Sequence, residues 1–178
     1  MKHTAPYLAA IAAFTAASAS AQTRVEMNLV DIKGVGASVG TVEFAAAQGG
    51  NGVLITPRLK GLPPGAHGFH VHEFANCGAK QKDGKMSAAE MAGDHYDPKK
   101  TRSHQGATGA GHIGDLPVLT VDAQGNSSSQ AMIAPRLSMK DLTGRAVVIH
   151  EGGDNQSDQP KPNGGGGTRI ACGVIAAK

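Results

Sequence analysis

Large aromatic side chains are nearly missing from this sequence. Tryptophan is absent, and aromatic residues make up only 3% of the chain. Aromatic rings usually supply much of the buried area of a protein core, so valine, isoleucine, leucine and alanine must fill the core here. A chain of 178 residues still buries about two-thirds of the surface that its unfolded form exposes. We therefore expect one folded domain.

Long apolar runs are missing as well. The run from Tyr7 to Phe14 falls far short of the roughly 20 residues that cross a bilayer as a helix. It follows the basic residue Lys2 and precedes the small residues 19–21, an order typical of a cleaved signal peptide. We expect a signal peptide over residues 1–21, an exported domain over residues 22–178, and no membrane partner.

No strong excess of charge of one sign is present. Without Lys2, the chain has 16 basic and 14 acidic residues, a formal charge of +2. Domains that bind nucleic acid usually carry a concentrated basic patch. We therefore expect no nucleic-acid partner, whereas a small anionic substrate is compatible with this charge.

Cysteine is scarce, with only Cys77 and Cys172. Export places them in an oxidising compartment, where a disulfide persists. We expect one bridge between them, and two buried free thiols are the alternative.

Long helical patterns are missing after residue 21. Short apolar segments recur instead between breaks that are rich in glycine, of which the chain has 25. This rhythm is typical of an antiparallel β-sandwich or barrel, here with about eight short strands. The expected strands lie at residues 25–29, 39–44, 53–55, 69–71, 116–121, 131–133, 146–149 and 170–175.

Two stretches interrupt this rhythm, Asn76–Gly114 and Glu151–Thr168. Both are too long for ordinary turns in a compact domain, and long loops often carry function. The second includes four consecutive glycines, 164–167, and is compatible with a flexible linker. Because a strand with Cys172 follows, we favour a lid that folds back onto the domain.

Six histidines lie where expected strands meet these loops: His70, His72, His95, His104, His112 and His150. In a strand, alternation sends His70 and His72 to the same face, about 6 to 7 Å apart, so that both can approach one metal. An isolated His-x-His is more often a polar strand face. His150 closes another apolar strand and is a candidate third ligand.

The first long loop contributes three more imidazoles. His95, His104 and His112 are followed by the carboxylate of Asp115. This is a ligand set that tetrahedral Zn²⁺ accepts. Each histidine alone is compatible with a surface position, but together with the carboxylate they favour a metal site.

The sequence resembles the copper,zinc superoxide dismutase family over nearly the whole expected mature chain. Five segments carry the resemblance in the family's order: GFHVHEF at 68–74, HYDP at 95–98, GHIGDL at 111–116, GRAVVIH at 144–150 and RIACGVI at 169–175. The resemblance implies an eight-stranded Greek-key β-sandwich or flattened barrel with two long functional loops. It also implies disproportionation of superoxide to oxygen and hydrogen peroxide through alternating reduction and oxidation of copper.

The resemblance further implies one copper and one zinc ion per subunit. Copper would be held by His70, His72, His95 and His150, and zinc by His95, His104, His112 and Asp115. His95 would thus bridge the two metals. Zinc would be structural, because it does not change its oxidation state.

Four further residues gain a role from the same resemblance. Arg169 matches the arginine that attracts the anion beside copper, and Asp154 matches the aspartate that links His70 to His104. Cys77 and Cys172 match the family disulfide.

The loop spacings resemble bacterial periplasmic members, which implies a periplasmic monomer or homodimer. The lid lacks the paired-glutamate and lysine pattern of eukaryotic members. The alternative function is a periplasmic copper- or zinc-binding protein without turnover. Such a protein needs neither an anion-guiding Arg169 nor a histidine shared by two metals.

Overall fold

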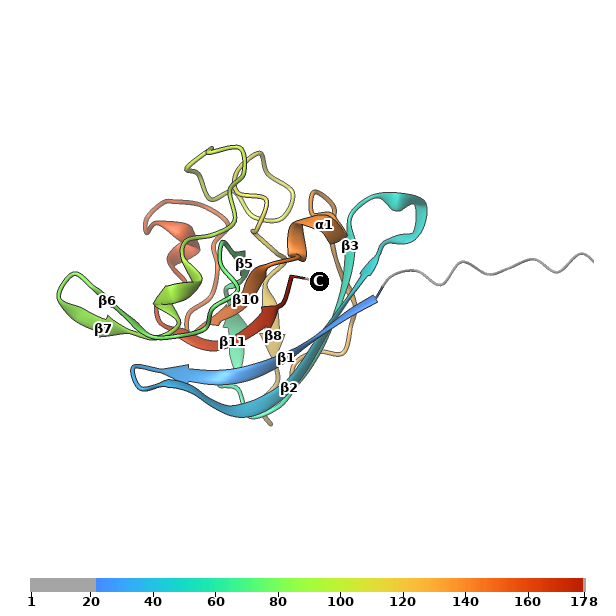
Figure 1. Cartoon of the computed structure of the whole chain (residues 1–178). Helices are drawn as coiled ribbons and strands as arrows, with labels where there is room; N and C mark the ends of the chain where they lie inside the picture. The colour runs from blue at the N-terminus through green and yellow to red at the C-terminus, as the bar shows by residue number, and fades with distance from the viewer. Residues whose placement is uncertain (1–21, 178) are drawn as a thin grey trace, which may run out of the picture.

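The computed structural model describes residues 22–177, which form a β-barrel with long loops at one end (Figure 1). The predicted signal peptide, residues 1–21, lies outside the described residues. None of the helices in the described part is long and apolar enough to cross a membrane.

A curled antiparallel sheet of seven strands makes up most of the barrel. In spatial order its strands are β5 (Phe69–His72), β10 (Arg145–His150), β11 (Arg169–Ile175), β1 (Gln22–Asp31), β2 (Gly34–Ala46), β3 (Val53–Leu59) and β9 (Met132–Ala134). β5 and β10 are far apart in the sequence but adjacent in the sheet, as are β11 and β1. β10 and β11, which flank the second long loop, therefore lie beside β5, which precedes the first.

The remaining elements are short. β4 (Gly65–His67) pairs with β8 (Leu119–Val121), and β6 (Lys80–Lys82) forms a hairpin with β7 (Lys85–Ser87). The helices are α1 (Met139–Leu142) and the 3₁₀ turns η1 (Gln48–Gly50), η2 (Glu90–Ala92) and η3 (Asn163–Gly165). The β6–β7 hairpin projects away from the barrel (Figure 1).

Strand β10 is apolar on both faces because both are covered. Val147 and Ile149 point into the barrel and join the main core. Ala146 and Val148 point outward and pack in a second cluster with Cys77 and other residues of the first long loop. The continuous apolar run in this strand therefore reflects burial on two sides.

The main core is largely aliphatic, as the scarcity of aromatic residues predicts. Phe44 and Phe69 are its two fully buried phenylalanines, and Met27 adds a flexible side chain. The other buried members are chiefly valine, leucine and isoleucine. Close packing of these side chains provides the rigid body on which the loops are mounted.

The expected all-β barrel is confirmed, and all eight expected strands are present, though not always with the expected bounds. The strand predicted at 116–121 begins only at Leu119, because Pro117 lacks the N–H that a sheet ladder needs. The strand predicted at 131–133 is shifted by one residue, to Met132–Ala134.

Three short strands were not expected. The interpretation of Asn76–Gly114 as uninterrupted loop was wrong at β6 and β7, because these polar three-residue strands show no apolar alternation. A signal was present in Asp83-Gly84. Both residues have positive φ, +50° and +78°, as a two-residue hairpin turn of this kind requires.

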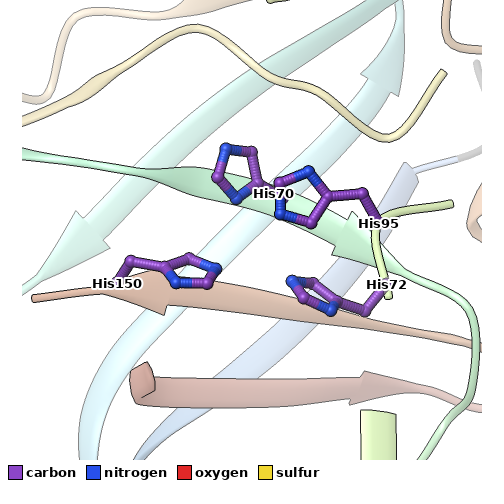
Figure 2. Close-up of side chains that lie close together, drawn as sticks. All are labelled: His70, His72, His95 and His150. Carbon is purple, nitrogen blue, oxygen red and sulfur yellow. The ribbon is translucent and has the colours of Figure 1, made fainter. Parts of the chain in front are cut away.

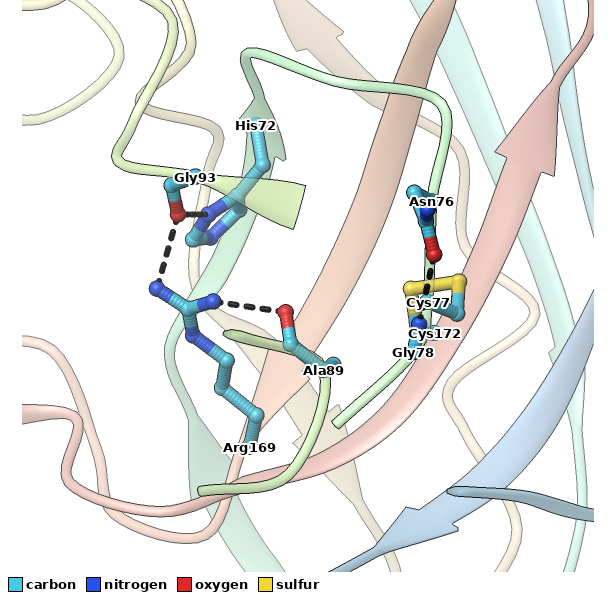
Figure 3. Close-up of a disulfide and its surroundings, with 8 residues drawn as sticks. All are labelled: His72, Asn76, Cys77, Gly78, Ala89, Gly93, Arg169 and Cys172. Atoms are coloured by element: carbon cyan, nitrogen blue, oxygen red, sulfur yellow. Dashed lines mark hydrogen bonds between the residues drawn. A yellow bond between two sulfur atoms is a disulfide. The ribbon is translucent and has the colours of Figure 1, made fainter. Parts of the chain in front are cut away.

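The expected disulfide is confirmed. Cys77 in the first long loop is bonded to Cys172 on β11, 95 positions further along the chain (Figure 3). It attaches the loop to the outer face of the sheet, and both cysteines belong to the second cluster.

Candidate metal centre

Three histidines share one face of the neighbouring strands β5 and β10. On β5, Phe69 and Val71 join the core, so alternation sends His70 and His72 to the outer face. His150 ends β10, which pairs antiparallel with β5. Strand geometry alone thus brings three imidazoles together beneath the loops.

A fourth imidazole comes from the first long loop. A backbone bridge joins His95 to His72, and the His95 ring stacks on His70 with 3.9 Å between ring centroids. His70, His72, His95 and His150 each offer one ring nitrogen within 4.8 Å of the others. We call them the four-histidine cluster; their rings surround a common space (Figure 2).

Each strand histidine is held at one ring nitrogen. The bonds are His70 Nε2 to Asp154 Oδ2 (2.8 Å), His72 Nδ1 to the Gly93 carbonyl (2.9 Å) and His150 Nδ1 to the Gly167 carbonyl (3.1 Å). The other nitrogen of each ring is buried and has no hydrogen-bond partner. Buried polar atoms are rarely left unpaired, so these three nitrogens fit a bound metal ion.

Asp115 organises a second group of imidazoles. Its Oδ1 lies 3.0 Å from His95 Nδ1, 3.0 Å from His104 Nδ1 and 3.3 Å from His112 Nδ1. The Nδ1 atoms of His104 and His112 are not aligned for hydrogen bonds. In a tetrahedral site with Zn–N of about 2.0 Å, ligand atoms lie about 3.3 Å apart. Each of these nitrogens therefore lies at about this separation from Asp115 Oδ1, and we call the four side chains the Asp115 group. The set whose ligand atoms all lie within 4.8 Å of one another contains His70 in place of His112.

His70 lies close to both groups. Its ligand atom also falls within 4.8 Å of those of His95, His104 and Asp115. His112 lies at the rim and is 8% exposed. Because Asp154 occupies His70 Nε2, the ring has only Nδ1 to offer, and it can serve one ion.

Asp154 connects the two groups through both carboxylate oxygens. Oδ2 accepts from His70 Nε2 and Oδ1 from His104 Nε2, each at 2.8 Å. Burial alone raises the pKa of Asp154, but the hydrogen bonds from His104 and His70 outweigh it and hold that pKa well below its usual range. Gly164, at φ +72°, packs directly on this carboxylate, where a Cβ would collide with it.

The strand histidines are neutral in the metal-free protein. Burial, together with charge repulsion from His95, holds the pKa of His70 and of His72 well below the usual value. The same two causes lower the pKa of His150 to about 4. Their unpartnered nitrogens therefore carry free lone pairs at neutral pH.

His104 behaves in the opposite way. Burial lowers its pKa, but the close contact of Nδ1 with Asp115, the hydrogen bond of Nε2 to Asp154 and the charges of both carboxylates raise it to about 9. In the metal-free protein the His104 ring is therefore a positively charged imidazolium at neutral pH, held between two carboxylates.

Arg169 begins β11 directly opposite His150. Its guanidinium donates to the carbonyls of Ala89 (2.7 Å) and Gly93 (2.8 Å). Because the Gly93 carbonyl also accepts from His72, one oxygen joins the arginine to the four-histidine cluster (Figure 3). The Arg169 guanidinium is thus fixed beside the cluster but is not itself a candidate metal ligand.

A cavity of about 640 Å³ opens beside the cluster, and His95, His150 and Arg169 line it. Glu90 also lines it, with its carboxylate 3.5 Å from Arg169 and 2.9 Å from Lys82. The carboxylates of Asp31 and Asp94 line it as well, so the positive charge nearest the cluster is the Arg169 guanidinium, which a small anion meets there.

Sequence reasoning missed several of these partners. The carbonyls of Gly93 and Gly167 orient two histidines, and no sequence signal marks a backbone oxygen. Glu90 is likewise brought to Arg169 only by the fold. His67, the remaining described histidine, contacts carbonyls of His150 and Pro63 through both nitrogens and has none to offer a metal.

These features define a class of protein: a β-barrel with two adjoining metal-binding groups, a shared histidine and a fixed cation beside one of them. The family model of copper/zinc superoxide dismutase (SODC) matches residues 38–175. The chain belongs to this family, and the expectation of a copper- and zinc-dependent enzyme is confirmed.

The similarity extends over nearly the full length of curated relatives. Superoxide dismutase [Cu-Zn] 2 of Salmonella typhimurium is 53% identical over 161 residues, covering 90% of this chain and 91% of the relative. Superoxide dismutase [Cu-Zn] of Escherichia coli is 50% identical over 176 residues, covering 98% and 99%.

Solved structures agree with the fold. The copper/zinc superoxide dismutase of Brucella abortus superposes with a TM-score of 0.84 at 45% identity, covering 87% of this chain and 99% of that one. The monomeric copper, zinc enzyme of Salmonella enterica gives 0.76 at 53% identity, with the same coverage.

Proposed function

We propose that this chain disproportionates superoxide at the four-histidine cluster, with copper held by His70, His72, His95 and His150. The observation that carries this assignment is the set of buried ring nitrogens without hydrogen-bond partners. Imidazole is a ligand that suits copper. Bound copper supplies the one-electron redox chemistry of the reaction.

Zinc is assigned to His95, His104, His112 and Asp115. His70 is the geometric competitor of His112, but its single free nitrogen, Nδ1, faces the four-histidine cluster. His112 Nδ1 is unpartnered and lies 3.3 Å from Asp115 Oδ1, which supports it as the fourth ligand. Zinc has no redox role, so it fixes the loop and the His95 ring.

His95 serves both groups because its two nitrogens face different sides. Nδ1 faces Asp115, which leaves Nε2 for the four-histidine cluster. Nε2 is therefore the atom at which a proton can be held and passed to the reduced product. The carboxylate of Asp115 and its neighbours keep the ring in place while this proton moves.

Arg169 draws and orients the anion. A guanidinium stays charged at physiological pH, and two carbonyl acceptors fix its position. Arg169 contacts the proposed metal ligands only indirectly, through the Gly93 carbonyl that it shares with His72. Its role is therefore to attract and orient the anion by its charge.

We also propose that the mature domain starts near Gln22, is exported to the periplasm and is a monomer. The predicted leader and the disulfide support export, and the Salmonella enterica relative described as monomeric supports the oligomeric state. Mass spectrometry of a periplasmic extract and sizing chromatography test these statements. An uncleaved N-terminus or elution as a dimer would contradict them.

The test of function combines metal analysis with superoxide consumption. The wild-type protein should bind one copper and one zinc and consume superoxide. His150→Ala should lose copper and activity but keep zinc and most of the fold, because the imidazole leaves from a strand end. Full copper occupancy with normal turnover in this variant would contradict the copper assignment, and metal binding without superoxide consumption by the wild type would indicate a metal-storage protein.

A further inference from the structure

Arg136 binds the backbone of the loop that carries two of the proposed zinc ligands. Its guanidinium donates to four carbonyls, those of Gly106 (3.0 Å), Ala107 (3.1 Å), Gly111 (2.9 Å) and His112 (2.6 Å). These bonds use four of the five N–H donors that an arginine has. Among the described residues no other side chain donates to as many backbone carbonyls, and Arg169 follows with two.

The four carbonyls depend on this one side chain. All four residues are buried, and within residues 22–177 none of these oxygens accepts a backbone N–H. Buried carbonyls need partners, so without the guanidinium this loop conformation would leave four acceptors unpaired. The loop would then open to water to satisfy them.

Arg136 itself has a fixed position. It follows β9 and lies between two core residues, Ala134 and Leu137, which are 1% and 2% exposed. The barrel therefore holds the arginine, and the arginine holds the loop. His104 precedes the bound carbonyls, and His112 contributes one of them.

We infer that Arg136 is a positioning residue for zinc: it holds the 104–112 loop in its metal-binding conformation before zinc arrives. The inference rests on the zinc assignment proposed above. It predicts that loss of the guanidinium affects zinc far more than copper, because three of the copper ligands, including His70 and His150, come from strands.

The experiment is a competitive titration of metal-free protein with zinc and, separately, with copper. Arg136→Met should weaken zinc binding about 10- to 100-fold, the usual range for a group that supports a ligand, and change copper binding less than about 3-fold. Arg136→Lys should resemble Arg136→Met, since an ammonium has its three donors on one nitrogen and cannot span four carbonyls. Arg58→Met is the matched control, because Arg58 is an exposed arginine on β3 that pairs with Glu43.

A second measurement reports on the loop without metal. The amides of Ala110 and His112 donate within this loop, to the Gln105 side chain and the Ser103 carbonyl. Their hydrogen exchange should quicken in metal-free Arg136→Met, while amides of the core strands keep their protection. A general loss of stability would instead quicken both sets.

His112→Ala in the same titration distinguishes an error in the zinc assignment from an error in the positioning role of Arg136. If it binds zinc normally, the zinc assignment is wrong. If it loses zinc but Arg136→Met does not, the assignment stands and the positioning role is wrong. Equal losses of zinc and copper in Arg136→Met, with faster exchange throughout the barrel, would also overturn the positioning role.

Discussion

Arg169 places a fixed positive charge beside the four-histidine cluster without offering a ligand. Arg169→Glu should therefore slow superoxide consumption at low ionic strength by about 10- to 1,000-fold, the range for electrostatic steering into a charged cleft, of which superoxide dismutase is itself a known example. Copper and zinc affinities should change little. Stopped-flow rates and metal analysis of the same samples measure the two effects.

Arg58→Glu is the control for this charge reversal, because it makes the same change on an exposed strand position paired with Glu43. Its rate should stay close to that of the wild type. A copper loss in Arg169→Glu that matches the loss of rate would show instead that Arg169 supports the structure of the site.

Asp154 accepts one hydrogen bond from His70 of the four-histidine cluster and one from His104 of the Asp115 group. Asp154→Asn should weaken zinc binding about 10- to 100-fold, as is usual for a carboxylate that orients a ligating histidine. Copper binding should fall less, because His104 lies in a loop whereas His70 is held by β5. Competitive titration measures both, and unchanged zinc affinity would leave Asp154 as an ordinary turn residue.

At the scale of elements, the first long loop is attached to the sheet by the Cys77–Cys172 disulfide. Cross-linking of residues 95 positions apart stabilises a fold by roughly 4 to 5 kcal/mol in the chain-entropy model, although measured values often fall lower. Replacing both cysteines by serine should lower the unfolding free energy of the metal-free protein by about 2 to 5 kcal/mol. Denaturant titration measures this change.

The same double variant tests whether the disulfide also positions the loop segment that holds Arg169. Ala89 and Gly93, whose carbonyls hold Arg169, lie in the part of the chain that the disulfide attaches. Activity should therefore fall even under conditions where the variant stays folded and metal-loaded. Full activity in the folded variant would show that the hydrogen bonds alone position this segment.

At the scale of the whole molecule, the two metal groups hold different numbers of protons before metal binds. His104 has a pKa of about 9 and is protonated at neutral pH, whereas burial keeps His70, His72 and His150 neutral. Zinc needs the His104 lone pair. Zinc binding should therefore release one proton from His104 between the ordinary histidine pKa and pH 9, and copper binding should release none from the strand histidines.

Zinc affinity should rise about tenfold per pH unit as the His104 proton is removed, and level off above about pH 9. Copper affinity should stay nearly constant above about pH 6.5. Calorimetry of the metal-free protein with each metal alone, in two buffers of different ionisation enthalpy, counts the protons, and equal release for both metals would contradict the difference in protonation. With both metals bound, His95 would lose one further proton, because both of its nitrogens would then be ligands.

The sequence alone determined those features that depend on local pattern. Alternation at Phe69-His70-Val71-His72 decided which side chains enter the core, and the recurring apolar segments predicted eight strands of an all-β fold. The unexpected strands β4, β6 and β7 escaped because each is only three residues long, too short for a periodic signal, and β6 and β7 are also polar. The candidate ligand residues could be named because imidazoles and a carboxylate are few and their chemistry is specific.

Only the tertiary structure decided which atom of each residue is available. It pairs β5 with β10 and places His95 over them, and its carbonyls at Gly93 and Gly167 occupy one nitrogen of His72 and His150. It also brings Arg136 onto four carbonyls some 24 to 30 positions away. A backbone oxygen has the same chemistry at every residue, so its role depends on position in space, which only long-range packing of the chain determines.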